Sequence, residues 1–96
     1  MPQTRAIRLI EAAQSAAQEG SFTKAISLFK SAVRLDPHLP SAYLQLANLY
    51  LALTMEREAQ RAAKEALTRA VAAGDRQTGA AALAFLVALT TPADPQ

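Results

Sequence analysis

Runs of apolar residues, separated by glycine, proline and short polar stretches, divide the chain into five segments with helical spacing. Threonine, serine and aspartate cap helix starts, glycine ends helices in a left-handed conformation, and proline disfavours helix in the residue before it. These signals predict helices over residues 4–19, 21–35, 40–53, 54–73 and 75–90. The expected boundary residues are Thr4, Thr54 and Asp75 as caps, Gly20 and Gly74 as helix ends, Asp36 with Pro37 as a stop, and Pro40 as a first helical residue.

The predicted fifth helix is unusual because every residue from Ala80 to Leu89 is apolar. A surface helix normally keeps one polar face, so both faces of this helix need a cover. The run is about half of the ~20 residues that cross a bilayer, so no membrane span is expected. The sequence therefore raises the question of what packs on the second face.

Alanine recurs along the chain at an offset of 34 residues. Small residues return where two helices must approach closely, and larger apolar residues return where they would fill the space between them. The pattern indicates a repeated helix pair more than a generic bundle, although alanine-rich bundles also carry periodic alanines. The recurring alanines are Ala13, Ala47 and Ala81, then Ala25 and Ala59, then Ala32 and Ala66.

The first unit contains the stretch EGSFTKAISLFKSAVRLDP, which resembles the tetratricopeptide repeat. The matching positions are Ala13, Gly20, Phe22, Ala25, Phe29, Ala32 and Pro37. The resemblance implies one all-α domain that forms a right-handed superhelix of antiparallel helices. Its expected units are repeats at 6–39 and 40–73, a half-repeat or capping helix at 74–91, and a disordered tail at 92–96.

The second unit departs from the family pattern. Thr54 stands where glycine is usual, Glu56 and Ala63 stand where aromatic residues are usual, and Val71 stands where proline is usual. Without that proline, the fourth helix is expected to run about a turn longer than the second.

The resemblance implies a scaffold whose first helices line a concave groove that holds a helix or an extended peptide of another protein. Ile10 stands where the first lysine of the family's carboxylate clamp would lie, so no clamp for acidic tails is expected. An apolar groove suits the nonpolar face of an amphipathic helix. The groove residues expected here are Ile7, Ile10, Gln14, Ala17, Ser41, Leu44, Asn48, Leu51, Thr78, Ala82, Phe85, Leu86 and Leu89.

Two faces are expected on the fifth helix. Ala80, Ala81, Ala84, Val87 and Ala88 are expected to pack on the fourth helix, which leaves Phe85, Leu86 and Leu89 toward the groove. A second copy, a helix of another protein or a further repeat could cover that side, or the helix could tilt inward and bury it. We favour self-association of the isolated chain through this helix, with client binding in the same groove.

Composition and charge narrow the function. The chain has no cysteine and one histidine, His38, in an expected loop, so no catalytic pair, metal site or cofactor site is expected, and the simplest compartment is a reducing cytoplasm. Charges of both signs alternate and sum to +2, which is not the basic face of a nucleic-acid binder. The leading hypothesis is a non-enzymatic protein-interaction adaptor or assembly chaperone. The alternative is a structural homo-oligomerisation module.

Overall fold

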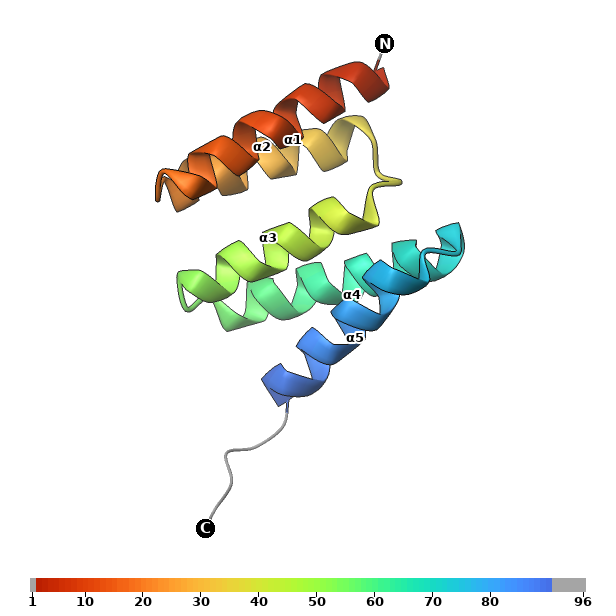
Figure 1. Cartoon of the computed structure of the whole chain (residues 1–96). Coiled ribbons are helices and arrows are strands. Elements are labelled where there is room, and N and C mark those ends of the chain that lie inside the picture. The colour runs from red at the N-terminus through yellow and green to blue at the C-terminus, as the bar shows by residue number, and fades with distance from the viewer. Residues whose placement is uncertain (1, 91–96) are drawn as a thin grey trace.

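The structure, a computed structural model, describes residues 2–90, and it folds them into five helices without a strand (Figure 1). This confirms the predicted all-α class. The expected disordered tail at 92–96 lies outside the described residues. The helices are α1 (Pro2–Gln18), α2 (Phe22–Leu35), α3 (Pro40–Ala52), α4 (Glu56–Ala73) and α5 (Arg76–Thr90).

The helices stack in chain order into an elongated molecule with extents of 52 × 31 × 17 Å. α1 and α2 form one antiparallel hairpin, α3 and α4 form a second, and α5 lies against α4 with a smaller contact to α3 (Figure 1). Packing is thus largely between neighbours in the chain, as in a helical repeat protein.

Most helix boundaries fall where local chemistry places them. Gly20 and Gly74 have left-handed φ values of +82° and +70°, which glycine adopts at little cost. Pro40 lies at the start of α3, where its missing N–H is not needed. Asp75 caps α5, because its Oδ1 accepts a hydrogen bond of 3.0 Å from the backbone N–H of Thr78. These boundary predictions are confirmed.

Two predicted caps are wrong. Thr4 lies inside α1, which already begins at Pro2. Thr54 is in the left-handed conformation with φ +57°, and its hydroxyl donates to the carbonyl oxygen of Leu53 at 2.6 Å, so α4 begins only at Glu56. The reason is the repeat, since position 54 is the equivalent of Gly20, and the turn needs a positive φ there.

α4 has 18 residues and α2 has 14, so α4 is about one turn longer. The two helices begin at equivalent repeat positions, Phe22 and Glu56, and α2 ends at Leu35, before Asp36 and Pro37. At the equivalent of Pro37, α4 has Val71 and continues. The expected extra turn is confirmed.

The interior consists mainly of small side chains. Among the described residues, only Phe29 is both large and fully buried. The buried face of α4 is entirely alanine, which lets α3 and α4 approach closely but leaves little bulk between them. The alanines of that face are Ala59, Ala62, Ala63, Ala66 and Ala70.

Candidate functional site

The predicted groove residues lie on α1, α3 and α5, the helices nearer the viewer in Figure 1. They differ in accessibility. Ile7, Gln14, Ser41, Asn48 and Leu51 are exposed. Ile10, Ala17, Leu44, Thr78, Phe85, Leu86 and Leu89 are half-buried, and Ala82 is fully buried.

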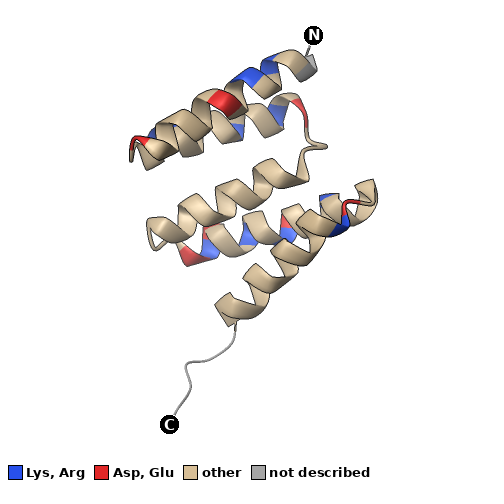
Figure 2. Ribbon diagram, viewed as in Figure 1, with Lys and Arg blue, Asp and Glu red and all other residues tan. Residues whose placement is uncertain are grey.

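Among the predicted groove residues, two large apolar side chains are exposed, one on α1 and one on α3. Ile7 of α1 is 53% exposed and Leu51 of α3 is 37% exposed. α3 carries no charged residue, so its solvent-facing side offers only apolar and neutral polar groups (Figure 2). Such a face can contribute apolar area to a ligand, but no charge of its own.

Two amide side chains among the predicted groove residues already have hydrogen-bond partners. Nε2 of Gln14 donates to Oε1 of Gln45 at 3.3 Å, which links α1 to α3. Nδ2 of Asn48 donates to the carbonyl oxygen of Leu44 at 3.2 Å. A peptide bound here would have to exchange these hydrogen bonds for its own.

The packing face predicted for α5 is wrong. Gly79 and Ala82 are its buried residues, whereas Ala80, Ala81, Ala84, Val87 and Ala88 are exposed. The smallest residue makes the closest contact, since a Cβ built on Gly79 would lie 3.6 Å from Cβ of Ala70 on α4. Because residues 80–89 are apolar on every side of the helix, polar residues do not mark which side faces solvent. The side with the small residues Gly79 and Ala82 is the one that packs.

The large side chains of α5 are correspondingly rearranged. Phe85 and Leu86 pack against the core, and Leu89 lies beside the start of α4, so all three are half-buried within the chain. The alternative of an inward-facing helix thus describes α5 better than an open groove wall. Ala82, being fully buried, cannot line an accessible groove. The exposed large residues of α5 are instead Leu83 at 52% and Val87 at 54%.

A hollow of about 430 Å³ lies between the carboxyl half of α4 and the start of α5. Its walls are largely apolar, and Val71, at the rim, is 72% exposed. The lining residues are Leu67, Ala70, Val71, Gly74, Asp75, Arg76, Gly79, Ala80 and Leu83. The sequence did not indicate this hollow, because it arises from the side on which α5 packs.

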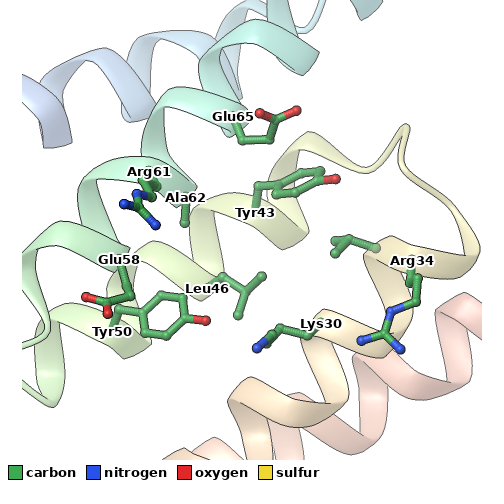
Figure 3. Close-up of a pocket in the computed structure, with 10 residues that line it drawn as sticks. Lys30, Arg34, Tyr43, Leu46, Tyr50, Glu58, Arg61, Ala62 and Glu65 are labelled. Atoms are coloured by element: carbon green, nitrogen blue, oxygen red, sulfur yellow. The ribbon is translucent and has the colours of Figure 1, made fainter.

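A second hollow, of about 590 Å³, lies between α2 and α4 above α3, and we call it the tyrosine cleft (Figure 3). Tyr43, Leu46 and Tyr50 line it from α3, and charged side chains of α2 and α4 surround them. The full lining is Lys30, Val33, Arg34, Tyr43, Leu46, Tyr50, Glu58, Arg61, Ala62 and Glu65. Repeat spacing identified the tyrosines only as space-filling positions, so their partial exposure was not expected.

Two interactions involving Arg69 lie beside the tyrosine cleft. Nε of Arg69 pairs with Oε1 of Glu65 at 2.8 Å, and the Arg69 guanidinium carbon lies 5.8 Å from the centroid of the Tyr43 ring, a cation–π distance. Burial, and secondarily the negative charge of Glu58, raises the pKa of Tyr50 above its usual range. The hydroxyl of Tyr50 therefore stays protonated near neutral pH, which suits hydrogen bonding more than proton transfer.

Charged side chains are unevenly distributed over the helices. α5 has one charged residue, Arg76, α2 has only the basic residues Lys24, Lys30 and Arg34, and α1 and α4 carry both signs of charge (Figure 2). Within residues 2–90, no group of three or more acidic, histidine or cysteine side chains is placed to hold a metal ion. None of the described helices has the length and hydropathy needed to cross a bilayer.

Two helix hairpins and a fifth helix, stacked with a 34-residue period, define a helical repeat protein. A model of the tetratricopeptide repeat family matches residues 16–84, and the chain belongs to this family. Tetratricopeptide repeats generally mediate protein–protein interactions and are generally not enzymes.

Solved structures agree on the fold. A crystal structure of a tetratricopeptide repeat domain protein from Salinibacter ruber is 21% identical with a TM-score of 0.79, over 93% of this chain and 94% of that one. A solution NMR structure of a tetratricopeptide repeat domain protein from the same organism is 20% identical with a TM-score of 0.82, over 100% of this chain and 94% of that one. A search of curated proteins finds no match.

Proposed function

We propose that this chain is a non-enzymatic scaffold, an adaptor or assembly chaperone, that binds the apolar face of a helix or peptide of another protein on its α1, α3 and α5 side. The observation that carries the proposal is the exposure of Ile7 on α1 and Leu51 on α3, the first helices of the two repeats. α3 itself has no charged residue. A reducing cytoplasm, expected from the cysteine-free composition, is part of the proposal.

The half-burial of Phe85 and Leu86 changes which residues contact the ligand. Side chains that pack on the core of the chain contribute little new buried area, so Ile7 and Leu51 become the main apolar anchors. Burying a large apolar side chain completely is worth about 1.5–3 kcal/mol, so two side chains with a third to a half of their surface exposed contribute about 1–3 kcal/mol together. Binding through this face is expected to be modest in affinity and sensitive to a single charge.

The test is affinity capture from a lysate of the source organism, with Leu51→Glu compared against Leu35→Glu. Leu35 of α2 is a matched control because it is 39% exposed, close to the 37% of Leu51, and is not on the proposed face. We expect the bound protein to be lost with Leu51→Glu and retained with Leu35→Glu, with both variants equally helical by circular dichroism. Loss with both variants, or with neither, would contradict the assignment of this face.

A second candidate function is self-association through α5, in which the chain acts as an oligomerisation module. The observation in its favour is that α5 exposes about half of both Leu83 and Val87 and has only Arg76 as a charged residue. Light scattering over a range of protein concentrations tests it. A mass that rises with concentration supports this function, and a constant monomer mass contradicts it.

A further inference from the structure

Nine residues of α5 are exposed, among them Arg76, Ala81 and Ala88. Six further residues recur at spacings of three, three, one, three and three, which places them on one side of the helix, and Arg76 lies on that side one turn before Ala80. All six are exposed. We call this face the α5 seam, and it consists of Gln77, Ala80, Leu83, Ala84, Val87 and Thr90.

The 34-residue period shows that the α5 seam includes positions that are interior in the previous repeat. Leu83 is the equivalent of Leu49, which is 8% exposed, and Ala80 is the equivalent of Leu46, which is 4% exposed. In α3 both positions belong to the core, which also includes residues of α1, α2 and α4. Two positions of the α5 seam are therefore positions at which the previous repeat packs helix against helix.

We propose that the α5 seam binds the α5 seam of a second copy of this chain, antiparallel, with the twofold axis between positions 83 and 84. This inference rests on the second candidate function, self-association, and specifies its surface. An antiparallel twofold pairing about this point joins residues whose numbers sum to 167. Leu83 then faces Ala84 of the second copy, and Val87 faces Ala80 of the second copy.

The sizes of the paired residues support this register. Each large side chain meets an alanine, so two layers can fill without a clash or a void. At both ends Gln77 meets Thr90 of the second copy, so a polar pair closes each end of the apolar strip. A shift by three residues would oppose Leu83 to Val87 or Ala80 to Ala84 of the second copy. A shift by four would set Val87 against Arg76 in one direction, and Leu83 against Ala88, outside the seam, in the other.

The charge distribution allows a second copy as the occupant. Arg76 is the one charged residue of α5, and it lies at the end of the helix. In this register the two copies of Arg76 are separated by fifteen residues of helical rise, about 22 Å, which exceeds the Debye length of about 8 Å at physiological salt. No like charges meet in the interface, and no complementary charge is needed from a different partner.

Cysteine cross-linking tests the register directly, because the chain has no native cysteine. Equimolar Ala80→Cys and Val87→Cys are mixed under mild oxidation and separated by non-reducing electrophoresis. We expect a covalent dimer from the mixture and none from either variant alone, since like positions lie about 10 Å apart along the axis and a disulfide needs Cα atoms within about 7 Å. A dimer from one variant alone at the level of the mixture would overturn this register.

Sedimentation equilibrium tests the surface independently. Leu83→Glu places a carboxylate against Ala84 of the second copy, and we expect dimerisation to weaken more than about tenfold. Leu35→Glu is the control, because Leu35 is 39% exposed on α2 and lies outside both the α5 seam and the hollow beside it. Equal weakening by both variants would overturn the seam, and monomers of the unmodified chain at all concentrations would overturn self-association with it.

The two proposals fail separately. Leu51 lies on α3 and outside the α5 seam, so Leu51→Glu is expected to leave the dimer constant unchanged while it removes the captured protein. Leu83→Glu is expected to do the reverse. A third outcome is also possible: the unmodified chain is a monomer, and Leu83→Glu abolishes the capture of another protein. In that case the other protein occupies the α5 seam, and the twofold pairing is wrong.

Discussion

Thr54 offers a stabilising substitution that follows from backbone geometry alone. It adopts φ +57° at the turn between α3 and α4, where the equivalent residue between α1 and α2 is Gly20 with φ +82°. The left-handed conformation brings the Cβ of an L-residue too close to the following carbonyl oxygen, and a β-branched side chain makes this worse. Thr54→Gly removes that strain without removing a buried contact, because Thr54 is exposed.

The expected gain can be worked from three contributions. The left-handed conformation costs about 1–2 kcal/mol for a residue with a Cβ. Against this, glycine loses about 0.5–1 kcal/mol more chain entropy on folding, and the hydrogen bond from the Thr54 hydroxyl to Leu53 is lost at a partly offsetting cost. We expect Thr54→Gly to raise the free energy of unfolding by about 0.5–1 kcal/mol, which corresponds to a melting temperature about 2–8 °C higher.

Urea unfolding followed by circular dichroism at 222 nm measures this change. The reciprocal substitution, Gly20→Ala, is the control, because a Cβ at Gly20 meets no atom within 4 Å and so reports the conformational cost alone. It is expected to lower the free energy of unfolding by about 0.5–1 kcal/mol, which is the left-handed cost less the chain entropy that alanine saves. An unchanged or lower stability of Thr54→Gly, alongside a destabilised Gly20→Ala, would refute the argument from strain at Thr54.

Substitutions at three further positions test the packing and the capping. Gly79→Ala should raise the free energy of unfolding in urea by about 0.5–1 kcal/mol, because the new methyl group would contact Ala70 at an ordinary 3.6 Å. Gly79→Leu should lower the urea midpoint, because the larger side chain would push α5 away from α4. Phe29→Ala should cost about 3–5 kcal/mol, and an unfolding midpoint close to that of the unmodified chain would contradict the central role of Phe29. Hydrogen bonds from the side chain and backbone of Thr78 hold the pKa of Asp75 below its usual range, so this carboxylate stabilises the fold at neutral pH and loses that effect as the pH falls below about 4. Asp75→Asn should therefore lose less stability than the unmodified chain between pH 5 and pH 3 in urea titrations, and equal losses would contradict the cap.

The sequence predicts the helix boundaries well because each depends on a few adjacent residues. Gly74, Asp75 and Pro40 act through their own backbone or their own side chain, so their effect does not depend on the tertiary structure. Thr54 shows the limit of such signals. Its hydroxyl is typical of a helix cap, but the repeat requires a left-handed residue at that position, and the tertiary requirement prevails over the local preference.

The orientation of α5 could not be predicted in the same way. An amphipathic helix shows its buried face by where the polar residues are missing, and the stretch from Ala80 to Leu89 contains none. Gly79 was the available signal, because the smallest side chain allows the closest approach to α4. The tyrosine cleft was missed for a related reason, since repeat spacing shows which positions are apolar but not how fully their neighbours cover them.

The unequal distribution of buried bulk has a consequence for how the chain opens. α2 buries Ile26 and Phe29, whereas α5 buries only a glycine and an alanine. Amide hydrogens should therefore exchange fastest in α5 and slowest in the first hairpin, with fraying that starts at the carboxyl-terminal helix. A molecule that occupies α5 would slow this fraying, so occupancy and resistance to proteolysis would rise together.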